Sequence, residues 1–284
     1  MKKRDLSIQS PLQDYELLDM GNGRKLEQFG EYVVDRPAPH ATEKPMLPDW
    51  QSDWLYSGTR ITEGEWLAQH DGLLPEWQVS IAGQTMHCRL GKGGQVGIYP
   101  EHVACWQWVQ ERLDACNHIS DLKVLNLFAG TGGTTLAAVR AGAEVTHVDA
   151  QASQIELARL NVGDKGARFI KEDVMSYVER MIRKGQRYHM VIMDPPSFGR
   201  AGKAKVWDIR SDLKPLIKYL PRLVTLDCRG IWVSLHTPDI NAEGITGLIN
   251  EVMHGVAQPL QLGTMTKDQR VLPAGVAAIW QGDT

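Results

Sequence analysis

The stretch Asn126-Leu127-Phe128-Ala129-Gly130-Thr131-Gly132-Gly133 decides the fold of this chain. The apolar residues at Val124–Phe128 predict a buried strand, and the pattern of Gly133–Ala141 predicts a helix. Small residues between a strand and a helix let a ligand approach the backbone and the amino end of the helix. By itself, such a turn also fits a packing role, or a nicotinamide or flavin site.

Strands and helices alternate on both sides of this turn. The predicted strands are Val124–Phe128, Glu144–Val148, Ala167–Ile170, Met190–Met193 and Gly230–Leu235. The predicted helices are Gly133–Ala141, Ser153–Asn161, Val174–Lys184, Leu213–Val224 and Ala242–Gly255. This alternation predicts a parallel sheet with helices on both faces. The tail, Leu260–Thr266 and Gly275–Gln281, predicts two more strands joined by a turn.

The residues before Pro100 follow a different pattern, with short runs separated by glycine, proline and tryptophan. Asn22-Gly23 stands between Tyr15–Asp19 and Lys25–Val34, and Asn-Gly between strand-like runs predicts a hairpin. Val79–Leu90 predicts further strands. We therefore expect a flexible N-terminus (1–14), a small β-rich (α+β) domain (15–99) and a larger α/β domain (100–284).

The composition of the 284 residues, 43% of them hydrophobic, suits one large core and a small second domain. The net charge of -3 and the pI near 6.3 argue against a global polycation, although a local basic patch remains compatible with them. Four cysteines lie far apart without metal-ligand spacing, which predicts reduced thiols and no metal site. No apolar stretch suits a membrane helix or a signal peptide, so we expect a soluble, cytoplasmic protein without a membrane partner.

Acidic residues follow the second and third strands of the α/β domain. Asp149 ends the strand after the glycine turn, where a carboxylate can accept both ribose hydroxyls of an adenosine. A cap for the helix that begins near Ser153 is the alternative, and enzymes that use NAD share the same feature. Asp173, beyond the strand that ends at Ile170, fits either an adenine amino group or a helix N-cap.

A third carboxylate follows the fourth strand, in Met190-Val191-Ile192-Met193-Asp194-Pro195-Pro196-Ser197-Phe198-Gly199-Arg200. Two prolines after Asp194 fix the backbone at the carboxyl edge of the sheet. An ordinary turn would also fit. The fourth strand, however, lies beside the crevice where the strand order should reverse and where ligands bind. A dehydrogenase has no evident use for an Asp-Pro-Pro segment there.

These segments together resemble the large-subunit ribosomal RNA methyltransferase family, and Asp194-Pro195-Pro196 is similar to motif IV of class I methyltransferases that modify nucleic-acid bases. The resemblance runs from about Gly93 to the C-terminus. It implies a Rossmann-like α/β sheet, mostly parallel with an antiparallel last strand, beside a small β-rich N-terminal domain. It also implies S-adenosyl-L-methionine as the cofactor, with Gly97–His102 closing over it.

The resemblance and the residue patterns together give a set of candidate site residues. The predicted cofactor-binding residues are Phe128, Ala129, Gly130, Thr131, Gly132, Asp149, Ala150, Asp173, Val174 and Asp194. The predicted catalytic residues are Asp194, Pro195, Pro196 and Phe198, and the predicted substrate contacts are Ser197, Arg200 and Lys203. Phe198 fits two roles equally, a stacking platform for an extruded base or a core aromatic.

Methylation of carbon 5 of cytosine requires a cysteine nucleophile, which would stand at the carboxyl edge of the fourth or fifth strand. The residues there, Asp194–Ser197 and Val233–Pro238, include no cysteine, and Cys228 precedes the fifth strand at the opposite edge. We therefore predict transfer without a cysteine nucleophile. His236 lies at the carboxyl edge, and we interpret it as a structural histidine.

Two clusters of basic residues differ in their expected positions. The cluster that begins at the catalytic edge is Arg200, Lys203, Lys205, Arg210, Lys214 and Lys218, and it suits phosphates. The cluster expected at the far edge, on a solvated helix face, is Arg180, Arg183, Lys184 and Arg187.

We expect an RNA base methyltransferase that acts on ribosomal RNA. Three alternatives remain: a methyltransferase of the same fold for a small molecule or protein, a nicotinamide- or flavin-dependent oxidoreductase, and a non-catalytic RNA-binding protein. The sequence does not predict the oligomeric state.

Overall fold

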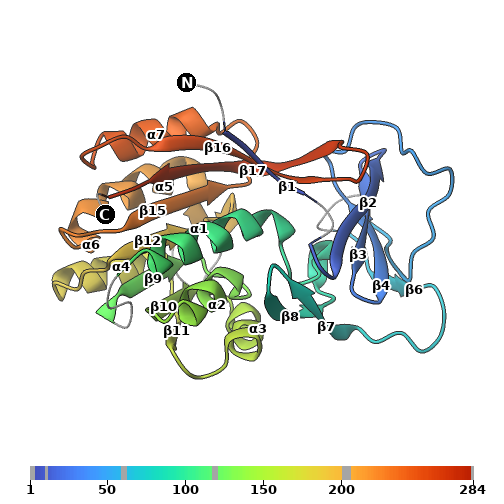
Figure 1. Ribbon diagram of the computed structural model, residues 1–284, viewed down its shortest axis with the longest axis horizontal. Coiled ribbons are helices and arrows are strands. Elements are labelled where there is room, and N and C mark those ends of the chain that lie inside the picture. The colour runs from blue at the N-terminus through green and yellow to red at the C-terminus, as the bar shows by residue number, and fades with distance from the viewer. Residues whose placement is uncertain (1–3, 10–11, 59–62, 117–120, 200–205, 283–284) are drawn as a thin grey trace. The chain divides into compact units, whose positions relative to one another are not determined.

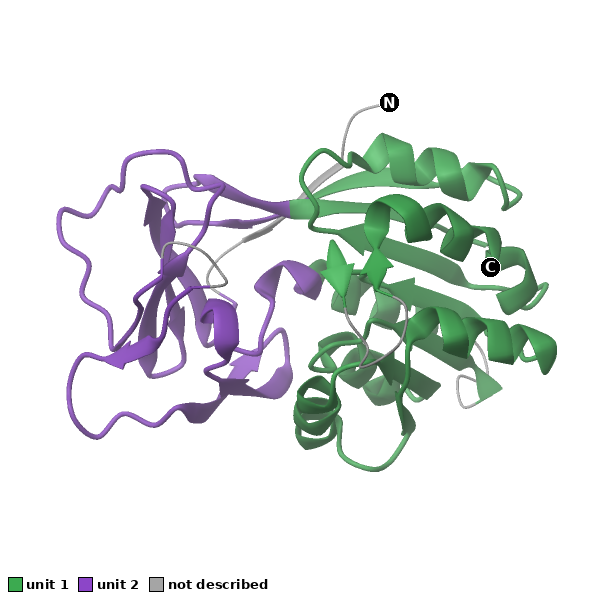
Figure 2. Ribbon diagram, turned by 180° about the vertical axis from the view of Figure 1, so that it is seen from behind, with its two compact units in different colours: residues 1–6, 104–261, 275–284 green, residues 7–103, 262–274 purple. Residues whose placement is uncertain are grey.

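The computed structural model describes residues 4–9, 12–58, 63–116, 121–199 and 206–282. The chain divides into two compact units (Figure 1, Figure 2). Unit 1 comprises residues 1–6, 104–261 and 275–284, and unit 2 comprises residues 7–103 and 262–274. The tip of the last hairpin, Leu262–Ala274, therefore groups with the N-terminal part of the chain.

The large sheet has eight strands in the order β1-β16-β17-β15-β12-β9-β10-β11. Their bounds are Arg4–Gln9 (β1), Lys123–Leu127 (β9), Glu144–Asp149 (β10), Ala167–Lys171 (β11), Met190–Met193 (β12), Gly230–Leu235 (β15), Gln258–Met265 (β16) and Val271–Trp280 (β17). The strands from β15 to β11 are parallel, and β17 is antiparallel to β15. The predicted mostly parallel sheet with an antiparallel last strand is confirmed. Strand β1 lies within the N-terminus that we expected to be flexible.

Seven helices accompany this sheet within the described residues. They are Val103–Asp114 (α1), Gly133–Arg140 (α2), Ala152–Val162 (α3), Val174–Arg183 (α4), Ile209–Lys218 (α5), Leu220–Leu223 (α6) and Ala242–Asn250 (α7). Helices α4 to α7 share one apolar core with a face of the sheet. In the parts of the chain that the structure describes, no helix is long and apolar enough to cross a membrane.

The alternation of side chains along β15 separates the two faces of the sheet. Ile231 and Val233 belong to the core on the side of α4–α7. Trp232 faces the other way, because successive residues of a strand point to opposite faces. Its ring lies 5.5 Å from that of Trp108 in α1, and Figure 1 shows α1 and α2 in front of the sheet. The sheet is therefore covered on both sides, as the alternating pattern predicts.

The predicted helix Leu213–Val224 is wrong as a single element. Helix α5 begins earlier, at Ile209, because the Asp208 side chain accepts a hydrogen bond from the backbone N–H of Arg210. It ends at Lys218, and α6 follows with Pro221 in its first turn. Helix α5 itself contains Pro215, so a proline alone does not end it; Pro221 lies in the first turn of α6, where its missing N–H is not needed.

Unit 2 contains a five-stranded sheet and a two-stranded pair. The strands are Tyr15–Gly21 (β2), Arg24–Phe29 (β3), Tyr32–Pro37 (β4), Trp54–Tyr56 (β5), Trp66–Ala68 (β6), Glu76–Ile81 (β7) and Gln84–Arg89 (β8). Two short 3-10 helices are Lys92–Gly94 (η1) and Pro100–His102 (η2). Asn22 and Gly23 have φ values of 53° and 79°, so the predicted hairpin is confirmed. The run Lys25–Val34 is two strands and not one, because a turn with Gly30 at φ 64° separates β3 from β4.

A buried carboxylate holds in place the connector between β4 and β5, which contains Pro39, Pro45 and Pro48. Asp19 accepts hydrogen bonds from the Leu47 backbone (2.8 Å) and the Trp50 indole (2.9 Å), and Arg270 contacts it at 2.6 Å. Burial alone would raise the pKa of Asp19, but these bonds lower it to about 2. The connector and the hairpin tip are thus both attached to β2.

Candidate functional site

The register of the parallel strands aligns their carboxyl ends in one row. The residues that stand opposite one another across β10, β9, β12 and β15 are Val148, Leu127, Met193 and Val233. The residues that come next are Asp149, Phe128, Asp194 and Ser234. The chain leaves β9 toward β10 on one side and returns to β12 on the other, so the strand order reverses between β9 and β12. Ligands of open α/β sheets bind at such a reversal.

The turn after β9 contains one residue with an unusual backbone conformation, Phe128, and one glycine with free space beside it, Gly130. Phe128 has a φ of 52°, which is unusual for a residue other than glycine, and its ring lies 4.8 Å from the buried ring of Trp207. A Cβ atom at Gly130 would meet nothing within 4 Å, whereas one at Gly133 would come within 2.3 Å of Trp106. Gly133 therefore serves packing, and Gly130 leaves the edge open to a ligand. Gly132 caps α2 without a side chain.

Asp149 ties two loops together at the end of β10. One carboxylate oxygen accepts from the backbone N–H of Gly130 (3.0 Å), and the other accepts from that of Gln151 (2.8 Å). Burial raises the pKa of Asp149, and these backbone hydrogen bonds oppose the rise. The N-cap position of α3 is Gln151, so Asp149 does not cap that helix. The carboxylate is therefore fixed next to the glycine turn.

Asp173 is the N-cap of α4, and its side chain accepts from the backbone N–H of Ser176 at 2.9 Å. The N-cap role is therefore confirmed, and a contact with adenine remains a prediction. The neighbouring Glu172 is bound through its side chain to Arg180. Its backbone N–H donates to the Asp149 carbonyl (3.1 Å), which brings the end of β11 beside the end of β10.

The Asp194 carboxylate contacts the side chains of Ser234 in β15 and His236 in the loop after it. The Ser234 hydroxyl donates to the Asp194 Oδ1 atom at 2.7 Å, and the Nε2 atom of His236 lies 3.1 Å from the same oxygen. The backbone N–H of Asp194 donates to the Leu127 carbonyl of β9. The side chains of Asp194 and His236 are 30% and 34% exposed, so a ligand can reach both. Our interpretation of His236 as a structural histidine missed its contact with Asp194.

The segment after Asp194 folds back as a small hairpin of β13 (Phe198–Gly199) and β14 (Trp207–Asp208). The Trp207 indole donates to the Pro196 carbonyl at 2.7 Å. The hydroxyls of Ser197 and Thr237 lie 2.7 Å apart. Phe198 is 61% exposed, so the alternative that it is a core aromatic is wrong. The hairpin presents this ring to solvent four residues beyond Asp194.

Other predicted residues lie outside the described residues, form ion pairs of their own or belong to unit 2. Arg200, Lys203 and Lys205 lie outside the described residues. Lys214 forms an ion pair with Glu251 at 3.2 Å, which reduces the net positive charge of the first basic cluster. The segment Gly97–His102, which the resemblance assigns to cofactor closure, belongs to unit 2.

Buried polar side chains form hydrogen bonds around the glycine turn. Thr135 of α2 lies 3.0 Å from the Asn126 amide and 2.9 Å from the Nδ1 atom of His147. Burial lowers the pKa of His147 to about 3, so this imidazole is neutral and shares one proton with Thr135. Asn161 of α3 donates to the Thr131 carbonyl at 2.7 Å. Sequence reasoning missed Thr135, His147 and Asn161, because their partners are distant in the chain.

This arrangement defines a class of protein. A strand–turn–helix with an open glycine, an acid on the next strand and a second acid across the strand reversal suits a bound adenosine. The antiparallel β17 beside β15 is the feature that nicotinamide-binding sheets lack. The sheet and its carboxyl edge therefore have the architecture of a class I methyltransferase.

Comparison with known proteins identifies the family. The sequence model of the S-adenosylmethionine-dependent methyltransferases matches residues 56–247, more than half of the chain, and the chain belongs to this family. Its cofactor is S-adenosylmethionine. The family assignment excludes the nicotinamide or flavin alternative.

Two curated relatives are ribosomal RNA methyltransferases. The chain is 33% identical to "Ribosomal RNA large subunit methyltransferase I" of Klebsiella pneumoniae over 197 residues, which cover 62% of this chain and 48% of that protein. It is 31% identical to "Ribosomal RNA large subunit methyltransferase K" of Neisseria meningitidis over 159 residues, which cover 54% of this chain and 43% of that protein. The chain thus spans about half the length of these relatives.

Solved structures share the whole fold. The S-adenosylmethionine-dependent methyltransferase from Agrobacterium tumefaciens is 29% identical, with a TM-score of 0.90 over 100% of this chain and 97% of that one. The protein SMU.776, solved in complex with S-adenosylhomocysteine, is 18% identical, with a TM-score of 0.72 over 95% of this chain and 76% of that one.

Proposed function

We propose that this protein transfers the methyl group of S-adenosylmethionine to a base of ribosomal RNA without a cysteine nucleophile. The observation that carries the proposal is Asp194, which is held by Ser234 and His236 at the strand reversal, four residues before an exposed phenylalanine. The names of the curated relatives supply the class of substrate. A ribosomal substrate also favours a cytoplasmic location.

The residues around the glycine turn would hold the cofactor. The Asp149 carboxylate suits the ribose hydroxyls, since two backbone N–H groups already fix its orientation. Asp173 and Val174 begin α4 beside this edge and suit the adenine. The open position at Gly130 leaves room for close approach to the backbone. When bound, the cofactor supplies an electrophilic methyl group, which leaves from a sulfonium.

The acceptor base would lie between Asp194 and Phe198. Methyl transfer is an in-line displacement, so most of the catalysis comes from holding the acceptor atom in position. The Asp194 carboxylate can accept a hydrogen bond from the base, and Ser234 and His236 fix one of its oxygens. The exposed ring of Phe198 can stack on an extruded base. Pro195 and Pro196 keep these two groups at a constant separation.

The four cysteines do not suit a nucleophile at this edge. Cys228 precedes β15, is 4% exposed, and its pKa is raised to about 12 by burial. Cys105 lies in α1 with 1% exposure, and burial also raises its pKa. Cys88 is buried in unit 2, and the Cys116 thiol donates to the Arg112 carbonyl at 3.2 Å. A thiolate at the acceptor is therefore not part of the proposal.

Mass spectrometry of digested ribosomal RNA tests the proposal. RNA from cells with and without the protein is compared, and RNA from the deletion strain is then incubated with the purified protein and S-adenosylmethionine. A methylated nucleoside that is absent from the deletion strain and restored in vitro supports the proposal. No difference between the strains, or transfer only to a small molecule or a protein, contradicts it.

Two matched variants test the chemistry. The Phe198→Ala variant should weaken turnover with RNA and leave the affinity for S-adenosylhomocysteine unchanged, because only the stacking surface is lost. The Cys228→Ser variant should retain transfer. Loss of transfer in Cys228→Ser, with an intact fold and intact cofactor affinity, contradicts a cysteine-free mechanism. A flat response of RNA affinity to salt would count against nucleic acid as the substrate.

A further inference from the structure

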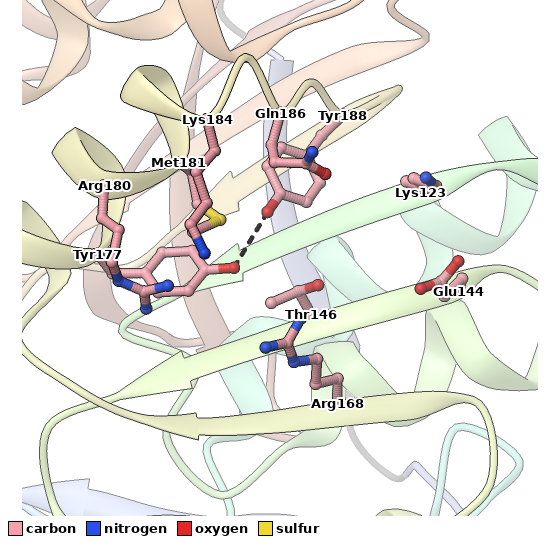
Figure 3. Close-up of a pocket in the computed structure, with 10 residues that line it drawn as sticks. All are labelled: Lys123, Glu144, Thr146, Arg168, Tyr177, Arg180, Met181, Lys184, Gln186 and Tyr188. Carbon is pink, nitrogen blue, oxygen red and sulfur yellow. Dashed lines mark hydrogen bonds between the residues drawn. The ribbon is translucent and has the colours of Figure 1, made fainter.

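A second site lies at the opposite edge of the same sheet. A pocket of about 290 Å³ opens beside the starts of β9 and β10 and under the end of α4 (Figure 3). Its lining residues are Lys123, Glu144, Thr146, Arg168, Tyr177, Arg180, Met181, Lys184, Gln186 and Tyr188. Lys123 and Glu144 are the first residues of their strands, so the pocket is at the amino edge, away from Asp149 and Asp194.

The charge of this pocket is unbalanced. Four of its lining residues are cations, and Glu144 is the single carboxylate among them. Arg180 is bound to Glu172 and lies over the Tyr177 ring. Within the described part of the chain, the ammonium and guanidinium groups of Lys123, Arg168 and Lys184 form no ion pair and no hydrogen bond. Like charges around one hollow repel one another, and a bound anion removes this repulsion.

The hydroxyls of two tyrosines add one neutral donor to the pocket, because the hydrogen bond between them uses one of their two protons. The hydroxyls of Tyr177 and Tyr188 lie 3.0 Å apart, and both residues are buried. Burial raises the pKa of Tyr188, so this hydroxyl keeps its proton. Figure 3 shows Arg168 of β11 and Lys184, the residue that follows α4, extending toward the tyrosine pair. Protonated hydroxyls beside a guanidinium and an ammonium are the donors that phosphate oxygens accept from.

The sequence suggested only a solvated helix face for the cluster that contains Lys184. The structure places this cluster at the amino edge, as expected, with Arg183, Lys184 and Arg187 exposed, but its members have different neighbours. Arg180 is bound to Glu172, and Arg187 donates to the carbonyls of Pro221 and Val224. Lys184 is directed into the pocket. The spacing of residues within α4 does not reveal the pocket, because Lys123 and Arg168 come from other elements.

We infer that this pocket binds a phosphate group, carried by a free nucleotide or by an RNA strand. Arg168 and Lys184 contribute the charged donors, and the tyrosine pair contributes one neutral donor. The inference goes beyond the proposed function, and neither cofactor binding nor methyl transfer enters its test.

The test is a titration of the full chain with three probes: inorganic phosphate, AMP, and a short single-stranded oligoribonucleotide. Adenosine serves as the probe without phosphate. The NMR signals of the Tyr177 and Tyr188 rings should shift saturably with at least one phosphate-bearing probe and not with adenosine. The probe that binds most tightly identifies the source of the phosphate. No saturable shift with any of the three, or an equal response to adenosine, overturns the inference.

A double variant and its matched control locate the site. Arg168→Ala with Lys184→Ala should weaken binding of the effective probe at least about tenfold, because two charge-assisted hydrogen bonds are lost. Lys165→Ala with Arg183→Ala removes the same charge from exposed residues outside the lining, and binding should change less than about twofold. Equal weakening in both double variants overturns the site. If a variant fails to fold, the titration of the unsubstituted chain still decides whether the pocket binds phosphate.

Discussion

The two edges of the sheet in unit 1 carry opposite charges. The charged side chains are fixed by hydrogen bonds at one edge and are not fixed in this way at the other. At the carboxyl edge, Asp149 and Asp194 accept hydrogen bonds from backbone N–H groups and from Ser234, which fix their orientation. At the amino edge, Arg168 and Lys184 surround a pocket without an ion pair of their own in the described chain. One edge is organised before any ligand arrives, and the other is completed by a ligand.

This difference follows from what each edge has to do. Catalysis gains from groups that are fixed in advance, because no reorganisation is then needed during the reaction. Anion binding needs mainly charge and donors within reach, and long side chains supply both. Substitutions at the carboxyl edge should therefore affect turnover and cofactor affinity, whereas those at the amino edge should leave both unchanged.

The largest expected effect is that of Asp194→Ala on turnover. The variant loses the carboxylate that positions the acceptor, and kcat should fall about 100-fold or more, as for other preorganised groups. Asp227→Ala is the matched control, since it removes an exposed carboxylate before β15, at the amino edge. Methyl transfer is measured with radiolabelled cofactor at saturating substrate. Equal losses in the two variants would remove the distinction between the edges.

The next effect is that of Asp149→Ala on cofactor affinity. Loss of a carboxylate at the ribose position should raise the Kd for S-adenosylhomocysteine about tenfold to hundredfold. Isothermal titration calorimetry measures the change, with Asp164→Ala as the control for an exposed acid. Unchanged affinity in Asp149→Ala would show that the ribose lies elsewhere.

The third prediction concerns the pH dependence of stability, which we expect to depend on His147 in β10, between the two edges. Its pKa is depressed to about 3 in the folded chain, so below pH 6.5 the unfolded chain binds more protons than the folded one. The free energy of unfolding should therefore decrease as the pH falls, by about 2 kcal/mol between pH 7 and pH 5. Denaturant unfolding at both pH values measures it. His147→Gln should flatten the dependence, and an unchanged slope in that variant would contradict this role.

The smallest expected effect is that of Ser234→Ala. The variant removes a hydroxyl that donates to Asp194, and kcat should fall about threefold to tenfold with an unchanged Kd for S-adenosylhomocysteine. Ser234→Thr retains a hydroxyl and should restore most of the turnover, and Ser153→Ala is the control. A matched loss of cofactor affinity and turnover would indicate a general structural defect instead.

The sequence predicts the parts of the site that follow from strand order and local pattern. The glycine turn, Asp149 and Asp194 are recognisable because parallel strands bring their carboxyl ends to one edge. The pattern does not reveal that Ser234 and His236 bind Asp194, because that depends on the exact register between β12 and β15.

Other features depend on contacts that no local pattern encodes. Arg270 reaches Asp19 from the far end of the chain, and the phosphate pocket combines β9, β10, β11 and α4 of unit 1. Phe198 is exposed because the Trp207 indole and the Pro196 carbonyl fold its segment into a hairpin. Such contacts are decided by packing and register, which the sequence alone leaves open.

A crystal structure of the protein with S-adenosylhomocysteine tests the central claim most directly. The ribose hydroxyls should lie within about 3 Å of the Asp149 carboxylate, with the sulfur end of the ligand directed toward Asp194. Binding of the nucleoside at the amino edge, beside Arg168 and Lys184, or contact with neither Asp149 nor Asp194, would contradict the account.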